Sequence, residues 1–321
     1  MFRTFGMTPQ YFDKFYVNLY FKINCFTKLC VTNLLNYMII NYLNSNIMDR
    51  KLRVAILDLN NNMPNRGITY LKRMVEAYGS LLSYEVFDVR FKNEIPDISF
   101  DIYISSGGPG SPFDYSGGWD KPYFELIDKL QTHNNDPSVE TKKYVFFICH
   151  SFQLACIHFK IGEVIERKSI SFGTYPCNKT EMSEKEPFFK KLHDPFWIAD
   201  FRNWQVVNAD ELYMHQQGFK IMALEKERLH VDLPRAVMAV RFSDEMFGTQ
   251  FHPEADADGM LTYFNEPERK AQVVDHHGQA RFNEMIADLT DNCKINLTHK
   301  IILPAFINNA IENLLEIMIE V

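Results

Sequence analysis

The chain has 321 residues, of which 34 are Lys or Arg and 41 are Asp or Glu, and 46% are hydrophobic. This composition is typical of a folded globular protein and excludes a disordered chain. The formal net charge of −7 argues against nucleic acid as a partner, because nucleic-acid-binding surfaces are rich in basic residues. The six cysteines form no Cys-x-x-Cys pair, so we predict free thiols in the cytoplasm and neither a disulfide framework nor a paired-ligand metal site.

The first 48 residues differ from the rest of the chain, because they are rich in Phe, Tyr, Asn and Ile and show no regular period. Residues 29–48 carry no charge, but their asparagines would need polar partners inside a bilayer, which argues against a membrane span. The charged residues 49–51 lead directly into an apolar strand pattern. Our hypothesis is therefore that residues 1–48 are an extension and that the functional protein starts at or near Met48.

Short apolar segments alternate with helical patterns along the next hundred residues. We predict strands at residues 54–59, 84–89, 102–104 and 144–148, with an amphipathic helix over 67–78 and a second helix up to 159. This alternation indicates βαβ units, hence a mostly parallel sheet with helices on both faces. Ligands bind beyond the carboxyl ends of the strands in such sheets, and three unusual segments fall at those ends.

The fourth predicted strand runs into Cys149, which is followed by a helical pattern. A cysteine at a strand-to-helix turn lies at a helix N-terminus, where the helix dipole and free N–H groups favour a thiolate nucleophile. A buried cysteine that only fills space is the alternative, because free cysteine is among the most buried residue types.

Two further segments supply what a nucleophile needs. Gly107 and Gly108 follow the third strand and let the backbone point N–H groups at a developing oxyanion, although Gly/Pro clusters are also ordinary turns. His252 precedes a proline and is therefore biased towards an extended conformation, in which Glu254 projects to the same side. A carboxylate beside a histidine is the arrangement that orients a general base for a thiol.

Together these segments resemble the class I glutamine amidotransferases with a Cys-His-Glu triad, over about residues 52–258. The resemblance rests on the loop from Ser106 to Pro112, on Cys149 with Gln153 four residues later, and on His252-Pro253-Glu254, in that order. It implies a flavodoxin-like α/β fold for residues 49–258.

The resemblance also implies a role for individual residues. Cys149 would attack glutamine to give a glutamyl thioester, His252 would carry the proton and Glu254 would orient His252. The backbone N–H groups of Gly108 and His150 would form the oxyanion hole. Substrate would be contacted by the residues of the glycine loop, the elbow helix and the loop that follows it, namely Gly107, Gln153, Phe172 and Gly173. Glutamine is then the substrate, a separate ammonia-accepting synthetase subunit is the expected partner, and no metal or other cofactor is required.

Two departures from the family pattern bear on specificity. The family elbow reads Gly-x-Cys-x-Gly-x-Gln, whereas this chain has Phe147 and Ser151 at the glycine positions, which predicts a reshaped elbow. The family segment that grips the glutamine backbone corresponds here to residues 200–205, which have an unrelated sequence.

The chain continues beyond the family domain with a predicted helical extension over residues 259–321. Apolar residues recur at helical spacing from Ala305 to Ile319, which predicts a helix that packs on the domain or on a partner. Adjacent His276 and His277 do not have the spacing of metal ligands. Two alternatives to a glutaminase remain open, namely acyl transfer of the homoserine acyltransferase type on the same Cys-His-Glu frame, and a catalytically silent binding module.

Overall fold

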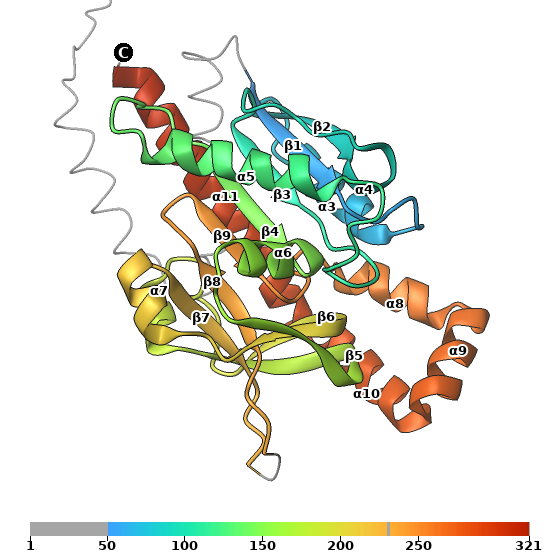
Figure 1. Cartoon of the computed structure of the whole chain (residues 1–321). Helices are drawn as coiled ribbons and strands as arrows, with labels where there is room; N and C mark the ends of the chain where they lie inside the picture. Colours follow the sequence, from blue (N-terminus) through green and yellow to red (C-terminus); the bar gives the residue numbers. More distant parts are fainter. Residues whose placement is uncertain (1–50, 230–231, 321) are drawn as a thin grey trace, which may run out of the picture. The chain divides into compact units, whose positions relative to one another are not determined.

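The computed structural model of the protein describes residues 51–229 and 232–320, drawn in colour in Figure 1. The predicted extension over residues 1–48 and its uncharged stretch lie outside the described residues. Within the described ranges, no helix is both long enough and apolar enough to cross a membrane.

The strands of the described residues form one nine-stranded sheet in the order β2-β1-β3-β4-β9-β8-β7-β5-β6. Its first half is parallel and consists of β2 (Leu82–Asp88), β1 (Leu52–Asp58), β3 (Ile102–Ser105), β4 (Tyr144–Ile148) and β9 (Met246–Thr249). Its second half is antiparallel and adds β8 (Val237–Arg241), β7 (Lys220–Glu225), β5 (Glu163–Lys179) and β6 (Phe196–Val207). The predicted α/β class is confirmed, and the parallel order belongs to the half that contains the four strands predicted from the sequence.

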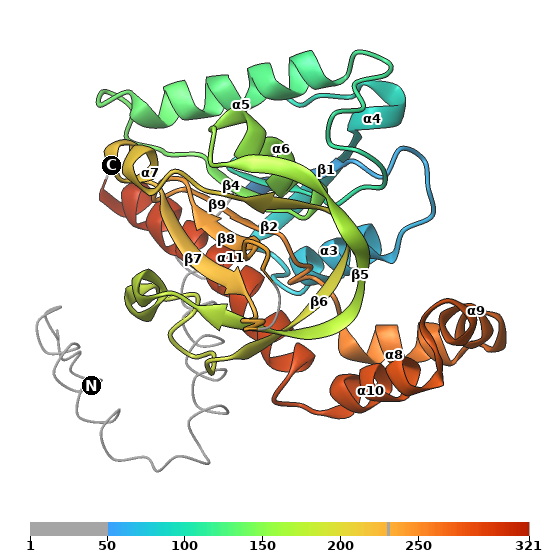
Figure 2. The same ribbon diagram turned by 60° about the horizontal axis from the view of Figure 1, so that its bottom comes forward.

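Helices cover both faces of the sheet (Figures 1 and 2). One face carries α5 (Asp120–Asn135) and α6 (His150–His158), and the other carries α3 (Arg66–Glu76) and α11 (Ile295–Glu320). The remaining helices lie at the ends and edges of the sheet, and they are α4 (Val89–Lys92), η1 (Glu181–Lys185), α7 (Glu211–Gln217), α8 (Ala257–Asn265), α9 (Pro267–His277) and α10 (Gln279–Thr290).

The central strands bury side chains on both faces, which explains why they read as continuous apolar runs. In β4, Val145 and Phe147 belong to the core beneath α5 and α6, whereas Tyr144 and Phe146 contact Phe306 of α11 on the other face. Helix α11 begins at Ile295, ten residues before the apolar stripe that was predicted from Ala305 onward, and it continues through Pro304. The carboxyl ends of β1, β3, β4 and β9 therefore meet at one edge of a well-packed sheet, and the site lies there.

The chain after residue 256 forms two different additions to the sheet. Helices α8, α9 and α10 make a separate layer beyond the carboxyl ends of the strands, whereas α11 returns beneath the sheet (Figure 2). The predicted domain boundary at residue 258 falls within the first turn of α8. The layer has its own apolar core, in which Met260, Phe264 and Phe282 pack with Ala199 of β6.

Candidate active site

Cys149 sits at the turn between β4 and α6 with φ 51° and ψ −98°, in the left-handed half of the backbone map. This region is costly for a residue with a side chain and persists only where the surroundings impose it. Two bonds do so here, because the Cys149 N–H donates to the Thr249 carbonyl at 2.8 Å and the Cys149 carbonyl accepts from the Gln153 N–H at 3.0 Å. The turn thus places the thiol at the N-terminus of α6, as predicted from the sequence.

The two departures at the elbow are both accommodated. The buried Ser151 hydroxyl accepts from the Ile148 N–H at 2.8 Å and donates to the Ser105 carbonyl at 2.7 Å, so it ties the elbow to the end of β3. Space for the Phe147 side chain is provided by Gly248 on the neighbouring strand β9. A Cβ at Gly248 would lie 2.9 Å from the Phe152 ring and 3.2 Å from Cβ of Phe147, so no larger residue fits there.

His252 and Glu254 follow β9 and face the thiol from the other side of the site. Nδ1 of His252 lies 2.8 Å from Oε1 of Glu254, and the imidazole lies close enough to Cys149 for the two groups to interact electrostatically. Burial of the ring opposes its protonation, but the negative charges of Glu254 and Cys149 outweigh that effect and raise the pKa of His252 well above its usual value. The ring is therefore built to hold a proton next to the sulfur.

Glu254 lies at the N-terminal end of α3. Its side chain is 4% exposed, and a Cβ added at Gly67 would lie only 3.3 Å from Oε1. The carboxylate is thus enclosed between His252 and the first turn of α3.

The glycine loop packs directly against Cys149 and His252. A Cβ at Gly107 would lie 2.8 Å from Cε1 of His252, and one at Gly108 would lie 2.3 Å from the Leu59 carbonyl oxygen, so both positions exclude a side chain. The buried Arg90 fixes the loop from outside, since its Nη1 donates to the Pro109 carbonyl at 2.6 Å. Gly108 and Cys149 line one cavity, which suits a donor aimed at an oxyanion.

The second expected oxyanion donor is the backbone N–H of His150, the first residue of α6. The first N–H groups of a helix have no carbonyl partner within that helix, so this group is available. The His150 imidazole points away into the protein, where it is 1% exposed. Burial and the neighbouring Arg90 cation lower its pKa to about 3, so the side chain is neutral and takes no part in proton transfer.

A cavity of about 930 Å³ opens in front of Cys149 and His252. Its walls come from the β1–α3 connection, the glycine loop, the β5 residue Phe172, the β6 residue Phe201, and one side of α8 and α9. A substrate thus has room on the side of Cys149 and His252 that faces the cavity, and the other side of these residues packs against the sheet.

Comparisons with known proteins identify the family. The model of the class I glutamine amidotransferase family matches residues 65–265, which is more than half of the chain. The chain belongs to the class I glutamine amidotransferase family. No curated protein matches it significantly.

Solved structures with this fold include a glutamine amidotransferase from Thermotoga maritima, with 14% identity, a TM-score of 0.60, and coverage of 82% of this chain and 99% of that one. A glutamine amidotransferase from Methylobacillus flagellatus has 13% identity, a TM-score of 0.56, and coverage of 83% and 95%.

Three of the four residues assigned to substrate on the strength of this family do not line the cavity. Gln153 is 3% exposed, and its Nε2 donates to the Trp204 carbonyl and to Oε1 of Gln250, both at 3.2 Å. Gly173 is covered, since a Cβ there would lie 2.8 Å from Nη2 of Arg281 in α10. Phe172 does line the cavity, with its ring stacked on that of His277 at 4.6 Å. Gly107 does not line the cavity either, but it borders Cys149 and His252.

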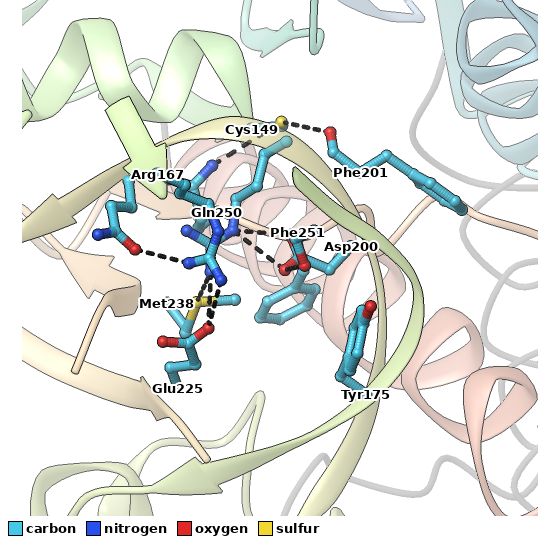
Figure 3. Close-up of polar contacts among 12 residues, drawn as sticks. Cys149, Arg167, Tyr175, Asp200, Phe201, Glu225, Met238, Gln250 and Phe251 are labelled. Carbon is cyan, nitrogen blue, oxygen red and sulfur yellow. Dashed lines mark hydrogen bonds and ion pairs between the residues drawn. The ribbon is translucent and has the colours of Figure 1, made fainter. Parts of the chain in front are cut away.

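The family's glutamine-gripping segment is occupied here by buried charges (Figure 3). Nε of Arg202 donates to both carboxylate oxygens of Asp200, at 2.9 and 3.0 Å, and its Nη2 lies 3.5 Å from Glu225. Glu225 also pairs with Arg167 at 3.1 Å. These charged side chains pair with one another on the side of Cys149 that faces away from the cavity. Arg202 therefore holds strand β6 in place and does not reach the cavity.

One residue close to the thiol was missed by the sequence analysis. Nε2 of Gln250 lies 3.8 Å from Sγ of Cys149, and the Phe201 carbonyl lies 3.9 Å from the same sulfur (Figure 3). Gln250 stands two residues before His252, so the alternation of an extended chain could have placed it on the same side as the histidine. Its partnership with Gln153 carries no sequence signal, because it joins elements 97 positions apart.

Proposed function

We propose that this protein hydrolyses the side-chain amide of glutamine through a glutamyl thioester on Cys149. The observation that carries the proposal is the grouping of Cys149, His252 and Glu254 at one cavity, with His252 hydrogen-bonded to Glu254 and the glycine loop packed against His252. Membership of the amidotransferase family supports glutamine as the substrate.

The mechanism assigns one task to each group. The Cys149 thiolate attacks the amide carbon, and the N–H groups of Gly108 and His150 stabilise the negative charge on the oxygen. The protonated His252 gives its proton to the departing nitrogen, so ammonia leaves. His252 then takes a proton from water as the water attacks the thioester, which releases glutamate and restores the thiolate. Glu254 keeps the imidazole oriented throughout.

Ammonia release requires an acceptor. We propose a separate synthetase subunit in this role, because the chain contains no Gly-x-x-x-x-Gly-Lys-Ser/Thr nucleotide loop that could activate an acceptor. We also propose that the protein acts in the cytoplasm.

The test is release of glutamate and ammonia from glutamine by the full chain, compared with Cys149→Ala and Cys293→Ala. Cys293 is an exposed free thiol far along the chain from the elbow and serves as the matched control. We expect Cys293→Ala to retain turnover, and Cys149→Ala to lose it together with the thioester detected by intact mass. Turnover that survives in Cys149→Ala would exclude the mechanism, and acylation of Cys149 by an acyl-CoA but not by glutamine would favour acyl transfer.

A further inference from the structure

The side-chain amide of Gln250 faces the sulfur of the nucleophile. Its Nε2 donates a hydrogen bond to Sγ of Cys149 over 3.8 Å (Figure 3). Gln250 is fully buried, and its backbone N–H donates to the Met238 carbonyl at 2.8 Å, which fixes the residue just beyond strand β9. An amide donor thus lies beside the reacting atom, and the mechanism proposed above does not use it.

The orientation of this amide follows from its neighbours. The amide atom of Gln153 that lies 3.2 Å from the Trp204 carbonyl must be Nε2, because a carbonyl oxygen only accepts hydrogen bonds. The same Nε2 lies 3.2 Å from the Gln250 amide, so the Gln250 atom that faces it must be the acceptor Oε1. The N–H groups of Gln250 are therefore turned towards Cys149.

The Trp204 carbonyl, on which this orientation depends, is held by the buried charges of β6. Nη1 of Arg202 donates to the carbonyl at 3.4 Å, while Nε of the same guanidinium is bonded to Asp200 at 2.9 Å. The side chains of Arg202, Gln153 and Gln250 are all buried, so water does not compete for these bonds. The buried ion pair therefore supports the Gln250 donor through one carbonyl and one further amide.

The sulfur also meets a carbonyl oxygen and a titrating ring. The Phe201 carbonyl of β6 lies 3.9 Å from Sγ of Cys149, where it accepts the S–H of a neutral thiol but repels a thiolate. His252 favours the thiolate only while its imidazole is protonated. An amide N–H does not titrate, so Gln250 favours the charged sulfur whatever the state of His252 and offsets the Phe201 carbonyl.

We propose that Gln250 is a further catalytic residue whose amide N–H stabilises the Cys149 thiolate, and that Gln153 is the positioning residue that turns this N–H towards the sulfur. The inference deepens the proposed function and rests on it for the identity of the nucleophile. No N–H bond breaks in this role. Gln250 donates to the thiolate before it attacks and again when hydrolysis of the thioester releases it, and Gln153 acts on Gln250 instead of on the substrate.

The experiment measures how fast iodoacetamide alkylates Cys149 in the full chain, with each cysteine followed by peptide mass. Gln250→Met keeps the length of the side chain and removes its N–H groups. We expect alkylation of Cys149 at neutral pH to slow about tenfold, as the loss of a hydrogen bond to a charged group gives. The rate should recover as the pH rises, because alkali ionises the thiol without the donor. Cys293, the exposed free thiol, should react at the same rate in both proteins.

Two further variants separate orientation from general loosening. Gln153→Met leaves the Gln250 donor in place but removes the group that orients it, so alkylation of Cys149 should slow less, about threefold. Asn134→Leu is the matched control, since both amide atoms of Asn134 are bonded to Lys143 at 2.8 Å, at the opposite end of β4 from Cys149. Its alkylation rate should stay within about twofold of the unaltered protein.

The inference is overturned if alkylation of Cys149 is unchanged in Gln250→Met, if it slows without recovering in alkali, or if Asn134→Leu slows it equally. Should Gln250→Met fail to fold, Gln153→Met decides in its place, because slowing that alkali reverses supports the inference and an unchanged rate overturns it. The assay uses no glutamine. A protein that releases no glutamate but shows the expected alkylation rates would overturn the proposed function alone, whereas normal release with unchanged alkylation in Gln250→Met would overturn this inference alone.

Discussion

In the proposed mechanism Glu254 acts only through His252, whose Nδ1 lies 2.8 Å from Oε1 of Glu254. Its negative charge helps to keep the pKa of the imidazole well above its usual value, against the effect of burial. The protonated form is the one that delivers a proton to the leaving nitrogen, so loss of that proton sets the alkaline limit of activity.

We therefore expect Glu254→Gln to lower the pKa of His252 and to move the alkaline limb of the kcat/KM profile to lower pH. Turnover should fall about a hundredfold but persist, because the thiol and the oxyanion donors remain. The measurement is a pH–rate profile of the variant beside that of the unaltered protein. An unchanged alkaline limb would show that another group sets the proton affinity of His252.

His150 makes a second pH-dependent contribution, this time to stability. The lowered pKa, about 3 against an ordinary 6.5, means that the folded protein keeps the ring neutral while the unfolded chain binds a proton below about pH 6.5. Stability from this group is therefore present above pH 6.5 and is lost as the pH falls towards 3, at about 1.4 kcal/mol per pH unit.

The corresponding variant is His150→Gln, which leaves the backbone N–H in place and removes the titrating ring. Between pH 6 and 4, we expect its free energy of unfolding to depend less steeply on pH than that of the unaltered protein, by about 1 kcal/mol per pH unit. Urea titrations at several pH values measure the two slopes. Parallel slopes would mean that His150 is protonated equally in the folded and unfolded states.

For individual residues, the sequence predicted best those positions at which the chemistry allows only a few residue types. Cys149, His252 and Glu254 were located from a strand-to-helix turn, a proline and a two-residue spacing, and the structure brings them together. The compensation between Phe147 and Gly248 could not be anticipated, because it depends on which strand becomes the neighbour of β4. For the same reason Gln153 appeared to be free for substrate until its partners were known.

At the scale of elements, Asp288 is one of the residues that attach α10 to β5, together with Arg281. This carboxylate is 3% exposed, accepts from the Thr174 hydroxyl and pairs with Lys294, both at 2.6 Å. Its removal would leave both partners without their buried acceptor, which is costly for groups shielded from water.

Asp288→Ala should therefore destabilise the protein by about 2 kcal/mol, and it should raise KM for substrate because the wall next to Phe172 loosens. Asp275→Ala is the control, since the Asp275 side chain is 87% exposed, and its effect should stay below about 0.5 kcal/mol. Chemical unfolding and steady-state kinetics on both variants give the comparison. Equal stability losses would indicate that α10 is held by its apolar contacts alone.

The elements predicted from the sequence were those with a strong local signal. Buried parallel strands read as apolar runs, and α3 has a clear amphipathic period. The long β5 and β6 strands were not anticipated, and the first eight residues of β5 are all half-buried or exposed, so they give no buried-strand signal. Helix α11 was predicted only after Pro304, since a proline normally ends a helix, whereas here the helix continues through it.

At the scale of the whole molecule, the described residues 51–229 and 232–320 contain the nine-stranded sheet, the helices on both of its faces and every residue assigned to the site. That the functional protein starts at or near Met48 stays a prediction. Removal of residues 1–47 should therefore leave the melting temperature of the remaining chain within about 2 °C and its turnover within about twofold. Calorimetry and the glutamine assay on the shortened chain provide the test, and insoluble or inactive product would refute the expectation.

Helix α11 also has a consequence for how the protein is made. Its buried residues, with Phe306 packed on Tyr144 and Phe146, close one face of a sheet whose strands lie up to 250 positions earlier in the chain. A ribosome synthesises that helix last of the described elements, so the part of this face that α11 covers stays exposed until translation has passed residue 315. Because exposed apolar strands favour aggregation, the nascent chain is most exposed to it before α11 packs on the sheet.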